Sequence, residues 1–155
     1  MRRTKNSEKA ATVRVVAVVL FILYFYILIK NSIFTRLITK NYMRGLSLIP
    51  FKSAAFKLDA YTDGLSFFFS TGFKSLIASI MMFIPMGFLL PFILTGERHF
   101  LKILGISFFT SIAIELLQYI TKSGVSSIDD LILAIAGALL GLLLHKILRF
   151  AFYNS

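Results

Sequence analysis

Cysteine is absent from the 155 residues of this chain, and its absence excludes disulfide bonds, thiolate metal sites and cysteine nucleophiles. Charged residues are scarce as well. They make up 15% of the chain, which is less than in an ordinary soluble domain. Hydrophobic residues, by contrast, make up 57%. This balance indicates that part of the protein is surrounded by lipid.

Acidic residues are the rarer of the two charged classes. Seven Asp and Glu stand against 17 Lys and Arg, which gives a net charge of +10 with neutral histidine. Most of the basic residues flank apolar runs, where such residues set membrane topology and contact anionic lipid. We therefore expect membrane lipid as a partner and no nucleic acid.

Sequence signatures of catalysis are also missing. The chain contains no Ser-His-Asp order, no phosphate-binding loop and no nucleotide fingerprint. His145 has no second histidine nearby with which to bind a metal ion. We predict no cofactor and no metal site. The missing motifs favour a protein that is not an enzyme, but they leave catalysis by other residues open.

Four long apolar runs are present, at residues 12–29, 76–94, 103–120 and 131–148. Each approaches the roughly 20 apolar residues that a helix needs to cross a bilayer core. No small-x-small cleavage site follows the first run, so we interpret it as an uncleaved span and not as a signal peptide. The sequence predicts an all-α transmembrane bundle of about four spans.

The connections between the runs differ in length. Residues 95–102 and 121–130 are short and predict antiparallel helix hairpins. Residues 30–74 form a long first loop, in which basic residues recur at helical spacing among apolar ones. We predict an interfacial helix there, lying on the membrane surface. The basic residues concerned are Arg36, Lys40 and Arg44.

The distribution of charged and apolar residues divides the chain into three parts. They are a basic N-terminus at 1–14, a transmembrane domain at 15–148 and a tail at 149–155. The basic N-terminus and the even number of spans predict that both termini are cytoplasmic. The seven Lys and Arg of the first loop would then lie outside the cell. Because basic loops favour the cytoplasmic side, this loop argues against the orientation.

Polar side chains inside a span are costly and therefore informative. Ser107, Ser111, Glu115 and Gln118 lie on one face of the third span. Two interpretations of Glu115 stand equal. In the first, Glu115 is a neutral carboxyl that forms a hydrogen bond with a neighbouring helix. In the second, it is a carboxylate that transfers protons or binds a ligand.

Two further spans carry features of helix packing. Pro85 lies inside the second span, where it deprives the Met81 carbonyl of its helical donor and predicts a kink. Small residues line one face of the fourth span and allow close helix packing. We expect this face to pack against the serines of the third span. The small residues are Ala134, Gly137, Ala138 and Gly141.

Asp129 and Asp130 begin the fourth span. Ser127 and Asp130 have the spacing of a capping box, and carboxylates are favourable at a helix N-terminus, so helix capping is the first interpretation. A contact role is the alternative, because the two aspartates lie at the same membrane face as the polar end of the third span. The apolar segment 48–51 would roof a polar cavity there.

Four motifs follow one another in a specific order. They are Leu48-Ile49-Pro50-Phe51, Phe83-Ile84-Pro85-Met86-Gly87-Phe88-Leu89-Leu90-Pro91, Ile114-Glu115-Leu116-Leu117-Gln118 and Ile128-Asp129-Asp130-Leu131-Ile132, with Gly137 after them. In this order and spacing they resemble the VanZ-like family of bacterial membrane proteins, over roughly residues 44–148. The best-known member of that family is linked to teicoplanin resistance. The resemblance implies a multi-pass protein of the bacterial plasma membrane.

The resemblance and the polar residues together give a set of candidate functional positions. The chain departs from the family pattern at Ser47, Ser79 and Ala134, where Asn is usual, and at Ser127, where an acidic residue is expected. Because these departures replace amide and acidic side chains, they argue against a ligand common to this chain and the rest of the family. The candidate ligand-binding or functional residues are Glu115, Gln118, Asp129, Asp130, Arg44, Pro50, Phe51, Ser79 and Pro85.

Three functions are considered. The leading one is a VanZ-like envelope protein that lowers glycopeptide susceptibility by binding a lipid-linked cell-wall precursor, a related wall ligand or the glycopeptide itself. The second is a membrane-embedded enzyme that uses its carboxylates as general acid and base. The third is a small proton-coupled transporter built around Glu115. Four short spans leave little room for a substrate path, so a transporter would require self-association, and the sequence leaves the oligomeric state open.

Overall fold

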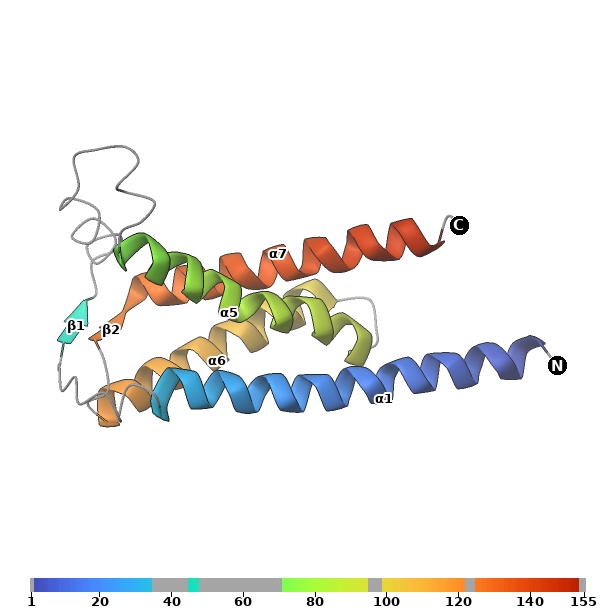
Figure 1. Cartoon of the computed structure of the whole chain (residues 1–155), viewed down its shortest axis with the longest axis horizontal. Helices are drawn as coiled ribbons and strands as arrows, with labels where there is room; N and C mark the ends of the chain where they lie inside the picture. Colours follow the sequence, from blue (N-terminus) through green and yellow to red (C-terminus); the bar gives the residue numbers. More distant parts are fainter. Residues whose placement is uncertain (1, 35–44, 48–70, 95–98, 122–124, 154–155) are drawn as a thin grey trace.

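A computed structural model of the chain describes residues 2–34, 45–47, 71–94, 99–121 and 125–153. Four long helices dominate these residues, accompanied by a short π-helix and two short strands (Figure 1). In chain order the elements are α1 (Arg2–Ile29), the π-helix η1 (Lys30–Phe34), β1 (Gly45–Ser47), α5 (Thr71–Ile93), α6 (His99–Thr121), β2 (Val125–Ser127) and α7 (Ile128–Tyr153).

All four long helices are long and apolar enough to cross a membrane. The candidate spans are Ala11–Ser32, Leu76–Ile93, Phe100–Thr121 and Ile128–Ala151. The predicted all-α architecture with four spans is confirmed, and the predicted spans differ from these only near their ends. Large apolar side chains stay exposed on each helix, among them Phe109 and Phe150, as expected where lipid surrounds a bundle.

The four helices alternate in direction. Figure 1 shows both chain termini at one end of the bundle and the strands β1 and β2 at the other, here named the strand end. The predicted hairpins, α5 with α6 and α6 with α7, are therefore present. The last residues of α1 and α6 and the first residues of α5 and α7 meet at the strand end.

A parallel strand pair closes this end of the bundle. β1 pairs with β2, with Gly45 opposite Val125 and Ser47 opposite Ser127. The pair joins the first loop to the connection between α6 and α7. Both segments were expected at the same face of the membrane. Strands of three residues carry too little pattern to be predicted. The predicted interfacial helix around residues 36–44 and the predicted roof at 48–51 lie outside the described residues.

The small face of α7 packs against α5. A β-carbon added at Gly137 would collide with the backbone carbonyl of Ile80, and one added at Gly87 of α5 would collide with that of Ala138. Gly141 meets α5 equally closely. The prediction that this face packs against the serines of α6 is therefore wrong. Close approach occurs where both helices offer small residues, and α5 offers Gly87.

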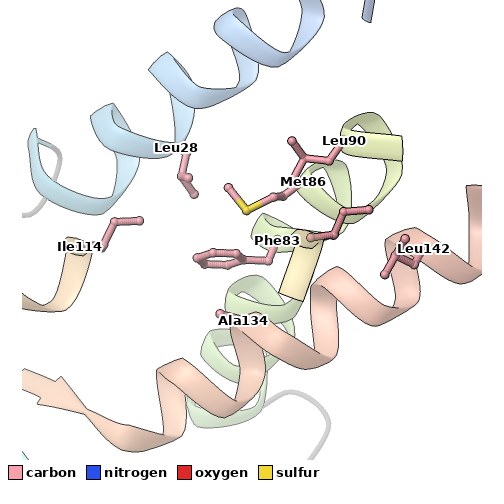
Figure 2. Packing of buried hydrophobic residues seen from close by; sticks show 8 residues of the cluster. Leu28, Phe83, Met86, Leu90, Ile114, Ala134 and Leu142 are labelled. Carbon is pink, nitrogen blue, oxygen red and sulfur yellow. The ribbon is translucent and has the colours of Figure 1, made fainter. Parts of the chain in front are cut away.

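Apolar side chains from all four helices fill the centre of the bundle. Figure 2 shows Phe83 and Met86 of α5 lying between Leu28 of α1, Ile114 of α6 and Ala134 of α7. Each of these side chains is buried. In lipid, such contacts stabilise a bundle through van der Waals packing, because lipid tails are as apolar as the side chains.

Helix α5 is continuous through Pro85 and Pro91. Pro85 has no N–H to donate to the Met81 carbonyl, and the kink expected there stays a prediction. The neighbouring carbonyl of Met82 accepts a hydrogen bond from the Tyr24 hydroxyl of α1, at 2.8 Å. This bond connects α1 to the backbone of α5 one residue after the carbonyl that Pro85 leaves without its helical donor.

Candidate functional site

The polar stripe of α6 faces the inside of the bundle, as predicted. Ser107, Ser111 and Gln118 are each at most 4% exposed. Glu115, on the same stripe, is half-buried. Polar groups placed in this way are shielded from lipid and must find partners inside the protein or in a bound molecule.

A partly open pocket of about 130 Å³ lies at the strand end, where η1, α5, α6 and α7 meet. It contains two carboxylates and one buried amide, with serine hydroxyls, the Asn31 side chain and apolar side chains around them. A pocket with polar groups is therefore present at the face where one was predicted, while its predicted roof at 48–51 lies outside the described residues. The lining residues are Asn31, Ser32, Ala78, Ser79, Met82, Phe83, Ser111, Ile114, Glu115, Gln118 and Asp130.

Gln118 connects α6 to the end of the first span. Its Nε2 donates a hydrogen bond to the backbone carbonyl of Ser32, at 3.0 Å. Ser32 lies in η1, and π-helical turns occur frequently at functional sites. The Oε1 of Gln118 is also buried, and it accepts no hydrogen bond from any residue that the structure describes. A buried acceptor without a donor is costly, so this oxygen is suited to a ligand.

Asp130 connects the first turn of α7 to α5. Its Oδ1 accepts a hydrogen bond from the Ser79 hydroxyl, at 3.3 Å. This bond reaches α5, and Asp130 also shares the pocket with Glu115 of α6. Asp129 lies in the same first turn and is buried, but it does not line the pocket. A first-turn position favours carboxylates in both cases.

The polar lining of the pocket combines two carboxylates, Glu115 and Asp130, with the amides of Gln118 and Asn31 and the hydroxyls of three serines. Phe83 and Ile114 form apolar walls. This lining suits a small polar group that is attached to an apolar one. Among the described residues, no three His, Cys, Asp or Glu side chains are grouped so as to hold a metal ion.

In a comparison with protein families, the model of the VanZ/LLP1 family matches residues 15–149. The chain belongs to the VanZ/LLP1 family. The resemblance inferred from the four motifs is thereby confirmed, and membership together with four span-forming helices makes this a multi-pass membrane protein. Comparisons with curated proteins and with solved structures gave no match.

The structure brings together four of the residues predicted for the site of this VanZ/LLP1 protein. Ser79, Glu115, Gln118 and Asp130 all line the pocket. Pro85 is half-buried in α5 but is not part of the lining. The functional roles of all of these residues stay predictions. Three further candidates, Arg44, Pro50 and Phe51, lie outside the described residues.

Sequence reasoning missed the contribution of the first span to the pocket. Asn31 and Ser32 follow the predicted end of that span, and they were not among the candidate site residues. A signal was nevertheless available. Two polar residues directly after an apolar run must lie at the membrane face where that run ends, and Gln118 lies near the same face.

Proposed function

We propose that this VanZ-like membrane protein acts at the bacterial cell envelope by binding the polar end of a lipid-linked or cell-wall-related molecule in the pocket. Binding of this kind would lower the susceptibility of the cell to glycopeptides of the teicoplanin type. The observation that supports the proposal is the pocket itself, in which two carboxylates and a buried amide lie together inside a bundle whose outer surface is apolar.

The cost of such a pocket supports a binding role. Ionisable side chains within membrane spans are expensive and usually mark a functional site. Here Glu115 and Asp130 come from different helices and converge on one space, together with Gln118. Packing alone would be served better by apolar residues such as those that fill the adjacent core. An amphipathic ligand matches a pocket with one polar side and one apolar side.

Teicoplanin susceptibility of bacteria that express the protein tests this proposal. Glu115→Gln keeps the volume of the side chain and removes its charge, so the bundle should assemble normally while ligand binding weakens. We expect the variant to bring susceptibility back to that of cells without the protein. Leu116→Ala is the matched control on the same helix, because Leu116 is 58% exposed and does not line the pocket.

Membrane abundance has to be equal in all strains, as measured by immunoblotting of membrane fractions. The control should then behave as the wild type does. Wild-type protein that leaves teicoplanin susceptibility unchanged would contradict the proposal. A Glu115→Gln variant that protects as well as the wild type would remove Glu115 from the site.

A membrane-embedded enzyme is the second candidate, because the two carboxylates line the same pocket. General acid–base catalysis needs two such groups within reach of one substrate. Incubation of the purified protein with membrane lipid extract, followed by mass spectrometry, separates the candidates. A binder leaves the lipids chemically unchanged, whereas an enzyme generates a new species that the Glu115→Gln variant fails to generate.

A further inference from the structure

Gln118 fixes the polarity of the pocket. We infer that the group bound there is a hydrogen-bond donor, an amine or a hydroxyl, and that Gln118 Oε1 accepts from it. The inference rests on the proposed function and specifies the chemical class of the ligand. It follows from how the two ends of the Gln118 amide are used.

The amide nitrogen of Gln118 is committed. Nε2 donates to the Ser32 carbonyl at 3.0 Å, and a flipped amide would place Oε1 against that carbonyl, which is also an acceptor. The orientation of the amide is therefore fixed, with Nε2 and not Oε1 against the Ser32 carbonyl. Gln118 is 4% exposed, and no described residue donates to this oxygen. A ligand donor is the group that would satisfy it.

Asp130 also offers hydrogen-bond acceptors to the pocket. Its Oδ1 accepts from the Ser79 hydroxyl, and a carboxylate keeps further acceptor capacity after one such bond. An ionised phosphate or carboxylate group of a ligand carries acceptors only, so neither Gln118 Oε1 nor Asp130 could form a hydrogen bond with it. An amine or hydroxyl group donates and therefore complements Gln118 and Asp130 together.

The size of the pocket limits the group. The pocket has a volume of about 130 Å³ and is partly open, so one end of a larger molecule can enter it while the rest stays outside. An aminoethyl group or one edge of a sugar ring is an end of this kind. The apolar walls at Met82, Phe83 and Ile114 would contact the carbon atoms next to the donor.

Three short-chain lipids with different donors test the inference on the purified full-length protein in detergent, with binding measured by thermal stabilisation. Dioctanoyl phosphatidylethanolamine supplies an ammonium with N–H donors. Dioctanoyl phosphatidylcholine has the same charges, but its methylated nitrogen cannot donate. A dioctanoyl glucosyl glycerolipid supplies hydroxyl donors without charge. We expect at least one donor lipid to bind about fivefold or more tightly than phosphatidylcholine, as one hydrogen bond allows.

Two substitutions at Gln118 separate donor recognition from the bulk of the methyl groups. Gln118→Lys can still donate to the Ser32 carbonyl but has no acceptor, so the preference for donor lipids should disappear. Gln118→Glu retains acceptor oxygens, so the preference should persist. Melting temperatures without lipid establish that each variant folds. If either variant fails to fold, the wild-type comparison of donor lipids with phosphatidylcholine decides alone.

The outcomes distinguish this inference from the function on which it rests. Equal binding of all three lipids by the wild type, or a preference that survives in Gln118→Lys, overturns the donor assignment and leaves the proposed function standing. Absence of binding by all three overturns both, since neither amine nor hydroxyl headgroups would then enter the pocket. A preference for the ethanolamine lipid identifies an amine, and a preference for the glucosyl lipid identifies a hydroxyl.

Discussion

Asp130 shows, at the scale of single residues, how a local role and a site role coincide in one side chain. Its position in the first turn of α7 suits the partial positive charge of a helix N-terminus. Its hydrogen bond from Ser79 and its place in the pocket go beyond this local role. The two roles require different chemistry, because only the site role requires a charged carboxylate.

Asp130→Asn separates the two roles. The amide keeps an oxygen that accepts from Ser79, and the weakened dipole interaction costs at most about 1 kcal/mol. We expect the variant to unfold thermally at nearly the wild-type temperature in detergent and to lose protection against teicoplanin. Asp129→Asn is the matched control, since Asp129 does not line the pocket. If both variants protect as the wild type does, the aspartates act as a helix cap and the site reduces to Glu115 and Gln118.

Single residues could be predicted from the sequence where membrane burial makes them unusual. Glu115, Gln118 and Asp130 stood out because they are polar within or beside apolar runs. The hydrogen bond between Gln118 and the Ser32 carbonyl could not be predicted. Its acceptor is a backbone group in a π-helical turn, and no residue type encodes the direction of such a carbonyl.

At the scale of elements, the interface between α5 and α7 depends on three glycines. Gly137→Ala would force its β-carbon against the Ile80 backbone carbonyl, so the helices would have to separate. We expect a loss of about 1–3 kcal/mol in the free energy of unfolding, as is typical of overpacking. Unfolding by titration with sodium dodecyl sulfate in mixed micelles measures this change.

Gly105→Ala is the matched control for the glycine substitution. A β-carbon at Gly105 meets nothing within 4 Å, so the same chemical change should be neutral or slightly stabilising through higher helix propensity. Equal losses at Gly137 and Gly105 would mean that the close approach of α5 and α7 does not exist.

The contact between α1 and α5 gives a second prediction for elements. Tyr24→Phe removes the hydroxyl that donates to the Met82 carbonyl beside Pro85, and should cost about 1 kcal/mol of unfolding free energy, as for other hydrogen bonds between membrane helices. Tyr26→Phe removes the same hydroxyl from a side chain that is 65% exposed and should cost nothing measurable. A Tyr24→Phe variant as stable as the wild type would contradict the role assigned to this bond.

Helix existence could be predicted at this scale, whereas helix partnership could not. The four apolar runs are long, so their spans were placed correctly to within a few residues. The small face of α7 was predicted to pack against the third span, and it packs against α5 instead. Gly87, located in the motif around Pro85, was the residue that pointed to α5.

At the scale of the whole molecule, the arrangement of the helices constrains topology. Both termini lie at one end of the bundle and the strand pair lies at the other (Figure 1). We predict that the termini are cytoplasmic and that the strand end faces outward, as the basic N-terminus suggests. The prediction of one shared end is confirmed, and the choice of membrane side stays a prediction.

Single introduced cysteines report the membrane side without background, because the chain has no cysteine of its own. A membrane-impermeant thiol reagent should label Ser126→Cys in intact cells, whereas Lys5→Cys should be labelled only after permeabilisation. The reverse pattern would place the pocket at the cytoplasmic face and would separate this protein from any ligand outside the cell.

The lipids that remain with the protein test the central claim, that the pocket binds an amphipathic envelope molecule. The wild type, a Glu115→Gln/Asp130→Asn double variant and a lipid-facing Leu139→Ala control are extracted from bacterial membranes in polymer nanodiscs, and their lipids are identified by mass spectrometry. We predict one lipid species that is enriched with the wild type and the control and lost from the double variant. The same lipid profile in all three would contradict the account.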